Sequence, residues 1–349
     1  MSCAGEGPPI LEGEGGYLPA SMKSAVPTAL VTLAGLPWQG RQASAASGDP
    51  VTGGRIRLDR ARLGVCGHFE KIAYRLIYEP WDAAERGRAD ARSWGRFTDV
   101  QIAWAPRAWL VVAAGLGKVP SGRGREQPIG ALAVPVLPGL TTAVAPDRRL
   151  GVMADAEVGV GRLAVGIYDA TRNFNFDGFE GLLLVGRLEL PLLGPVSRRN
   201  WPEAGAWTDR KRVIFGGTAQ YRVGRRDGTG YLVGGDAGFA WRRVFVGAEV
   251  LYARRWPSER DPTKILPRAI GGWAEGVVQI WRPYLTVALR GEYLDGNLDP
   301  AGAYVGFTPA VTLALPGPLV QLQAMYTHKF HFAGRRSDDV ALIAVTLER

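Results

Sequence analysis

From residue 54 onward the chain repeats one unit: a segment of about ten residues in which apolar and polar or small side chains alternate, followed by a turn. In residues 244–252, apolar side chains from Val244 to Tyr252 occupy every second position, and Gly247 and Glu249 stand between them. Successive side chains of a β-strand point to opposite faces, so this period of two predicts strands and an all-β fold.

The charged residues within these segments oppose the aliphatic set, so each predicted strand has one apolar and one polar face. A soluble sandwich with its polar face outward would give the same alternation, and the pattern alone leaves both architectures open. The residues concerned are Asp99, Asp155, Glu157, Arg187, Glu189, Asp236, Glu249, Glu275, Arg290 and Glu292.

The connections favour a barrel in a membrane. Outer-membrane barrels have short turns on one side, long loops on the other, and aromatic girdles at both interfaces. Aromatic residues bracket the short turns here: Trp104 with Trp109, Trp241 with Phe245, and Trp281 with Tyr284. Short connections at 105–107, 159–161, 242–243, 282–283 and 316–318 alternate with long ones at 80–93, 119–148, 172–180, 255–267 and 331–337.

No apolar run is long enough for a membrane helix, whereas a closed barrel pairs every backbone group internally. We therefore expect a transmembrane antiparallel up-and-down β-barrel of about 16 strands, or else 14, because bacterial single-chain barrels have even numbers. Fifteen segments can be counted, so either one strand is miscounted around residues 192–210 or an extra strand comes from residues 28–38. The segments start near residues 55, 71, 96, 108, 149, 162, 181, 211, 230, 243, 268, 284, 303, 319 and 339.

The N-terminal part has the order of a secretory signal peptide. A basic start at Met22-Lys23 precedes an apolar stretch, and Ala43-Ser44-Ala45 supplies a small-residue exit. We expect residues 1–21 to be an extension before the true start, residues 22–45 to be a cleaved signal peptide, and residues 46–349 to form the barrel. The alternative for residues 28–38 is a buried strand.

Several stretches resemble the phosphate-selective porin O and P family of outer-membrane channels. They are residues 60–65 with Tyr74-Arg75-Leu76, residues 117–120 before a long loop, residues 145–152 where that loop returns, and residues 161–175. The resemblance runs in matching order over residues 60–195. It implies a 16-stranded, trimeric, anion-conducting porin whose long loop, here residues 119–149, folds into the lumen.

A pore selects by its diameter, its lining groups and its field, and Arg suits phosphate because its planar fork donates two parallel hydrogen bonds. We expect basic residues on the inner face and in the long loop to line the pore. The alternative is that much of the Arg pairs with acids across the inner wall. The candidates are Arg60, Arg62, Arg75, Lys118, Arg123, Arg125, Arg148, Arg149, Arg187 and Arg290.

Other chemistry has weaker support. No G-x-S-x-G motif is present, the three His residues do not suggest a metal site, and the Arg residues are dispersed rather than gathered for nucleic acid. We expect no enzyme, cofactor, metal or nucleic-acid partner. The sequence predicts a channel in the outer membrane of a Gram-negative bacterium, contacting lipid, forming a homotrimer and passing small anions. The alternatives are a structural or plugged barrel and a barrel-borne hydrolase.

Overall fold

In the computed structural model, the described residues are 24–41, 55–82, 96–126, 134, 138–170, 181–194, 208–224, 228–257, 265–281, 284–295, 303–315, 319–332 and 336–348. Within them lie sixteen strands and two short helices. The strands are β1 (Ser24–Arg41), β2 (Arg55–Phe69), β3 (Ile72–Asp82), β4 (Arg96–Arg107), β5 (Leu110–Lys118), β6 (Arg148–Val158), β7 (Gly161–Asp169), β8 (Gly181–Leu193), β9 (Thr208–Gly224), β10 (Gly228–Arg242), β11 (Val244–Pro257), β12 (Ile265–Trp281), β13 (Leu285–Asp295), β14 (Tyr304–Leu315), β15 (Leu319–His331) and β16 (Arg336–Glu348). The helices are α1 (Arg123–Glu126) and α2 (Gly139–Val144), both between β5 and β6.

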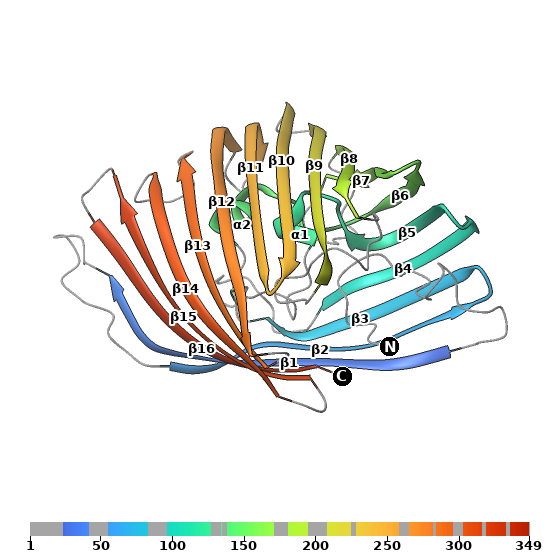
Figure 1. The fold of residues 1–349 in the computed structure, drawn as a ribbon. Coiled ribbons are helices and arrows are strands. Elements are labelled where there is room, and N and C mark those ends of the chain that lie inside the picture. Colours follow the sequence, from blue (N-terminus) through green and yellow to red (C-terminus); the bar gives the residue numbers. More distant parts are fainter. Residues whose placement is uncertain are drawn as a thin grey trace.

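The strands form one antiparallel up-and-down sheet in which β2 to β16 follow chain order (Figure 1). The barrel closes through β1, which pairs with β2 on one side and with β16 on the other. Ser24 lies opposite His68, and Leu30 lies opposite Glu348. Closure leaves no unpaired sheet edge among the sixteen described strands, as a barrel in hydrocarbon requires.

The alternation located the strands well. The fifteen predicted segments correspond to β2 through β16, and residues 192–210 contain the end of β8 and the start of β9. The sixteenth strand is β1, which includes the alternative strand at residues 28–38. Removal of residues 22–45 as a signal peptide would delete this strand, so the two interpretations exclude each other in one mature chain. Cleavage itself stays a prediction.

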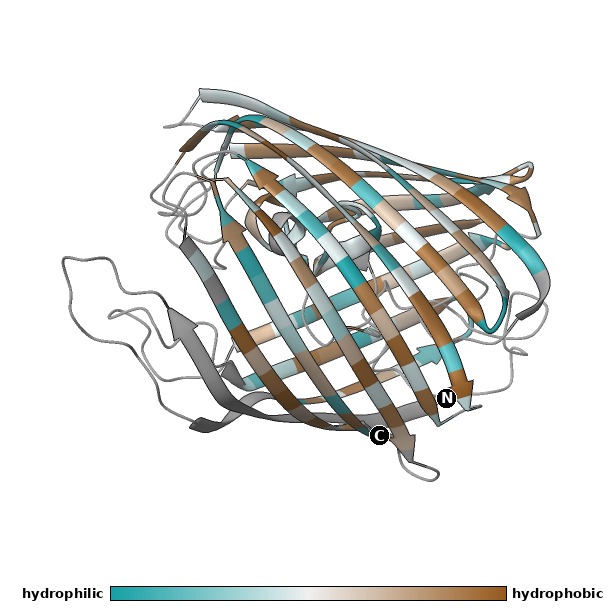
Figure 2. Ribbon diagram, turned by 60° about the vertical axis from the view of Figure 1, so that its left-hand side comes forward, coloured by the Kyte–Doolittle hydropathy of each residue, from teal (hydrophilic) through white to brown (hydrophobic). Residues whose placement is uncertain are grey.

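The outer wall is apolar. Val246 and Val250 are 47% and 56% exposed, whereas Phe245 and Leu251, which alternate with them, are buried inside. Brown and pale bands alternate along the strands in Figure 2 for the same reason. None of the helices within the described residues is long and apolar enough to span a membrane.

Aromatic side chains at the short turns follow the predicted pattern with one exception. Trp104, Trp109 and Trp281 are exposed on the outer wall, and the Trp281 ring lies 5.2 Å from that of Tyr284. The prediction for Phe245 was wrong, because its side chain is buried inside the barrel. β11 begins at Val244 directly after a tight turn, which places Phe245 at an inward position.

The inner wall carries charge, as the alternation predicts. Of the ten charged residues assigned to the polar face, eight are buried, whereas Glu157 is exposed near a turn and Glu292 is partly exposed. The buried eight are Asp99, Asp155, Arg187, Glu189, Asp236, Glu249, Glu275 and Arg290.

Candidate functional site: the lumen and its inward loop

Between β5 and β6, the helices α1 and α2 lie inside the barrel, behind β10 to β12 in Figure 1. The two ends of this loop are tied together at the wall. The Val119 amide donates to the Asp147 carbonyl at 2.8 Å, and the Ser121 hydroxyl donates to the Pro146 carbonyl at 3.0 Å. The loop therefore leaves and re-enters the wall at one point, and its described parts, residues 119–126, 134 and 138–147, lie in the lumen.

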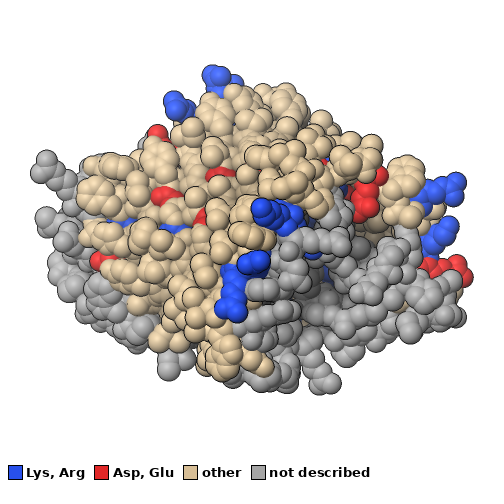
Figure 3. Space-filling model, in the orientation of Figure 1, with Lys and Arg blue, Asp and Glu red and all other residues tan. Residues whose placement is uncertain are grey.

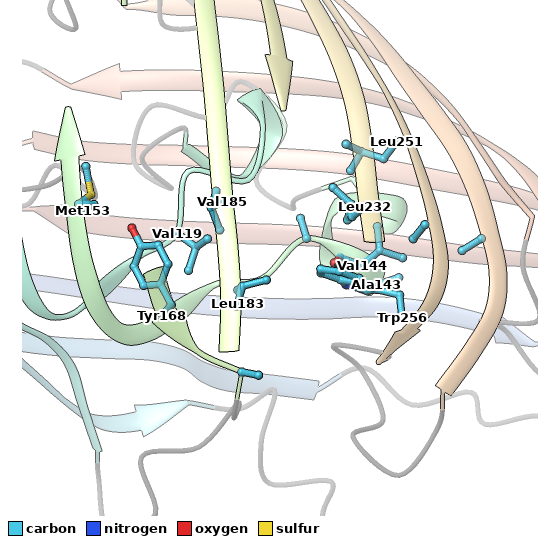
Figure 4. Packing of buried hydrophobic residues seen from close by; sticks show 14 of the residues in the cluster. Val119, Ala143, Val144, Met153, Tyr168, Leu183, Val185, Leu232, Leu251 and Trp256 are labelled. Carbon is cyan, nitrogen blue, oxygen red and sulfur yellow. Dashed lines mark hydrogen bonds between the residues drawn. The ribbon is translucent and has the colours of Figure 1, made fainter. Parts of the chain in front are cut away.

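An apolar cluster holds the loop against the inner wall (Figure 4). Val119 and Val144 from the loop are fully buried with Leu232 and Leu251, which point inward from β10 and β11. The Trp256 indole nitrogen donates to the Val144 carbonyl at 2.8 Å. Burial and this hydrogen bond fix the C-terminal half of the loop on β10 and β11.

One carboxylate on the inner wall, that of Glu249, accepts hydrogen bonds from the loop and from a neighbouring strand. Glu249 Oε2 on β11 accepts hydrogen bonds from the Gly124 amide at 3.0 Å, the Trp273 indole nitrogen at 2.9 Å and the Thr141 hydroxyl at 3.4 Å. A Cβ built on Gly124 would lie 2.8 Å from this oxygen, and Gly122 has φ +126° beside the same carboxylate. Glycine at both positions lets the backbone approach Glu249 closely.

Arg123 follows Gly122 and faces the wall. Its guanidinium carbon lies 4.6 Å from the Phe245 ring centroid, a cation–π contact. Burial lowers the pKa of Arg123 to about 10, and the nearby carboxylates of Asp236, Glu275 and Glu249 oppose that shift. The side chain therefore stays cationic at neutral pH and attracts the acidic part of the wall.

A belt of ion pairs extends along the same wall, and it includes two of the predicted pore-lining residues, Arg187 and Arg290. Both are buried and paired with acids, so they fit the alternative interpretation, in which arginines pair with acids across the inner wall. Arg162 links Asp155 to Glu189, and Glu189 also contacts Arg187. The N–O distances are 2.7 Å for Arg162–Asp155, 2.9 Å for Arg162–Glu189, 2.9 Å for Arg187–Glu189, 2.7 Å for Arg187–Asp236 and 2.6 Å for Arg290–Glu275.

The other predicted basic residues lie on β2 to β6 and at the loop neck. Arg62 pairs with Glu79 at 3.1 Å, and Arg75 is buried on β3. At the neck, Lys118 and Arg149 are buried, and Arg148 contacts Asp99 and Asp147, each at 3.2 Å. Arg60 lies on β2 and Arg125 on α1, but their side chains fall outside the described part of the chain.

The structure thus separates the predicted cations into two groups. Arg187 and Arg290 belong to the belt on β6 to β13, and Arg123 on α1 lies beside it. Arg62, Arg75, Lys118, Arg148 and Arg149 lie on β2 to β6. Reasoning from the sequence missed Arg162, although its position opposite Glu157 beside a short turn places it on the inner face. It also missed Trp273 and Trp256 as loop contacts. Within the described residues, no group of His, Cys, Asp and Glu could hold a metal ion.

No family model and no curated relative matches this chain. Solved structures do. OprB of Pseudomonas putida has 7% identity, covers 94% of each chain and has a TM-score of 0.63, and the outer-membrane channel DcaP of Acinetobacter baumannii has 12% identity, covers 96% of this chain and 99% of its own, and has a TM-score of 0.64. A trimer form of OmpT, an outer-membrane protein of Vibrio cholerae, has 9% identity, covers 94% of this chain and 100% of its own, and has a TM-score of 0.57. The chain has a porin fold. At these identities the likeness concerns the porin barrel and not the solute.

Proposed function

We propose that the protein is an outer-membrane channel for passive diffusion of small solutes, with a preference for small anions such as phosphate. The observation that carries this proposal is the combination of an apolar outer wall, a charged inner wall and a loop docked inside a closed barrel. An apolar outer wall is suited to contact with lipid, and charged groups on the inner wall create an electrostatic field that acts on solutes. No covalent step is involved.

The setting follows from the same features. A closed barrel with exposed aliphatic side chains belongs in hydrocarbon, and the porin fold supports the outer membrane of a Gram-negative bacterium. The trimer form of OmpT supports a homotrimer for this chain as well. The lipid and the partner subunits would both contact the apolar outer wall.

The anion preference rests on the basic residues of β3 to β6. Arg123, Arg187 and Arg290 lie among carboxylates, so the belt contributes little net positive charge. Around the loop neck, Lys118, Arg148 and Arg149 outnumber Asp99 and Asp147. An excess of cations there would enrich small anions locally, and Arg forks would favour phosphate oxygens.

Conductance of the purified full chain in planar bilayers tests the proposal. A salt gradient across the bilayer should give a reversal potential of the sign for anion preference, and added phosphate should reduce chloride current. Equal permeability of both ions would remove the anion preference but keep the channel. Cation preference would contradict the assignment of the basic residues at the neck.

A plugged barrel is the second candidate, favoured by the shielding of the inner wall. On β14 to β16, where the inward side chains are mostly uncharged, Thr308 is 3%, Gln323 4% and Leu342 7% exposed. A protein that inserts into the bilayer but carries no current would support this candidate over the channel.

A further inference from the structure

Two arginines face each other on the outer wall. Arg254 of β11 and Arg268 of β12 are direct cross-strand partners, and both side chains are exposed. They share outward positions with Tyr252 and Ile270, which are also paired. Like charges directly opposite on one face of a sheet repel each other, so this arrangement calls for an anion.

The described part of the protein does not supply that anion. Neither guanidinium forms an ion pair or a hydrogen bond with any described residue. On the neighbouring strand β13, Asp295 is the direct partner of Ile270 and not of Arg268. Ile270 lies two residues nearer the middle of the barrel than Arg268, so Asp295 is on the hydrocarbon side of Arg268. The two cations are therefore available to a group that approaches from outside the barrel.

The position of the two arginines along the barrel axis corresponds to the level of the lipid headgroups. On β11, outward side chains change from Val250, which is 56% exposed, to Tyr252 and then Arg254 toward the long-loop end. On β10, Tyr231 lies opposite Arg254, and its ring centroid is 6.0 Å from that of Tyr252. This order of aliphatic, aromatic and cationic side chains matches the order of hydrocarbon, interface and headgroups.

Figure 3 agrees with this position. Lys and Arg side chains stand at the upper edge of the molecule, where the long-loop ends of β11 and β12 lie in Figure 1, and below them extends a surface of mainly uncharged residues with a few Asp and Glu side chains. The long-loop side of such barrels faces the cell exterior.

We propose that Arg254 and Arg268 bind a phosphate group of a lipid headgroup in the outer leaflet. Two planar guanidinium forks would donate paired hydrogen bonds to the phosphate oxygens, and its charge would remove the repulsion between them. Tyr231 and Tyr252 would pack beside the headgroup at the level of the interface. The site is on the outside of the barrel and is separate from the proposed path of solutes.

The test compares the full-length protein with the double variant Arg254→Gln, Arg268→Gln in detergent. The matched control is Lys211→Gln, Arg242→Gln, which removes two exposed cations that lie 5.0 Å from the Trp241 ring at the short-turn end. Each protein receives lipopolysaccharide, the same lipid after removal of its phosphates, or inorganic phosphate. Bound lipid is counted by native mass spectrometry, and the unfolding temperature is recorded.

We expect lipopolysaccharide to raise the unfolding temperature of the wild-type and control proteins, and the double variant to lose most of this shift and at least tenfold in lipid affinity. Dephosphorylated lipid should have little effect on any of the three. Equal lipid binding by wild-type protein and double variant would overturn the proposal, as would equal stabilisation by dephosphorylated lipid. A full shift with inorganic phosphate alone would identify a free-ion site and would also overturn it. Channel conductance should be the same in all three proteins, so the result is independent of the proposed function.

Discussion

Arg187 on β8 reaches over β9 and contacts Asp236 on β10, with 2.7 Å between Nη1 and Oδ2. The residue of β9 that lies between Glu189 and Asp236 in the register is Gly216. A Cβ built there would lie 2.5 Å from Asp236 Oδ1. Because Gly216 has no side chain, there is space over β9 for this ion pair, which joins β8 to β10 although the two strands are not neighbours.

Gly216→Ala should therefore destabilise the barrel, although alanine is ordinarily the better residue within a strand by about 0.5–1 kcal/mol. The added methyl group displaces the Asp236 carboxylate and weakens a buried ion pair. We expect a loss of about 1–3 kcal/mol, measured by urea unfolding in detergent. Gly276→Ala is the control, because a Cβ at that strand position meets nothing within 4 Å. Equal stability of the two variants would contradict the role assigned to Gly216.

Glu249→Ala should release the inward loop from the wall. It removes the acceptor for the Gly124 amide, the Thr141 hydroxyl and the Trp273 indole, and each buried donor left unpaired costs about 1–3 kcal/mol. We expect larger fluctuations of single-channel current. Glu249→Gln keeps one oxygen acceptor and should have a smaller effect.

The exposed Glu157, near a short turn and away from the loop, provides the control Glu157→Gln. Its current should match that of the wild-type protein. A Glu249→Ala channel with unchanged mean current and noise would mean that the apolar contacts alone hold the loop.

Ion preference should depend on the loop neck and not on wall ion pairs whose charges cancel. Lys118→Gln with Arg149→Gln removes two positive charges from the lumen, and we expect the reversal potential in a salt gradient to move toward cation preference. Arg62→Gln with Glu79→Gln removes a whole ion pair, so the net charge and the reversal potential should hardly change. If the second pair shifts the potential as much as the first, the neck does not set the preference.

The assembled protein should retain residues 24–41, because β1 pairs with both β2 and β16. N-terminal sequencing of heat-modifiable protein from the outer-membrane fraction decides the point. A mature chain that starts after Ala45 would instead support signal cleavage, and β2 and β16 would then have to close the barrel without β1.

How far the sequence predicts this molecule depends on which constraint acts on each residue. The outer wall must be apolar at every second position, so residues such as Val246 and Val250 reveal β11, and the same rule locates β2 to β16. β1 escaped this rule because an apolar stretch after Met22-Lys23 fits an export signal as well as a strand. The tight turn before Val244 also misled the assignment of Phe245 to the outer girdle.

The candidate site was less predictable, because its contacts join segments that no local pattern relates. The alternation places Glu249 on the inner face, yet its partners Gly124 and Thr141 belong to a loop without periodicity. Likewise, neither Arg187 nor Asp236 indicates by itself that Gly216 lies between them. Such relations depend on strand register, which is fixed only when the whole barrel forms.

The pairing of β1 with β16 has a consequence for assembly. Leu30 and Glu348 come from opposite ends of the described chain, so the last seam of the barrel depends on the most distant contacts in the sequence. Contacts of this kind form slowly, because the entropy of ordering the intervening chain is lost before they are made. Until the seam forms, two rows of backbone donors and acceptors remain open, and pairing with another chain competes with closure. Closure of this seam therefore competes with aggregation along it. A partner that shields the open strand edges during insertion would favour closure.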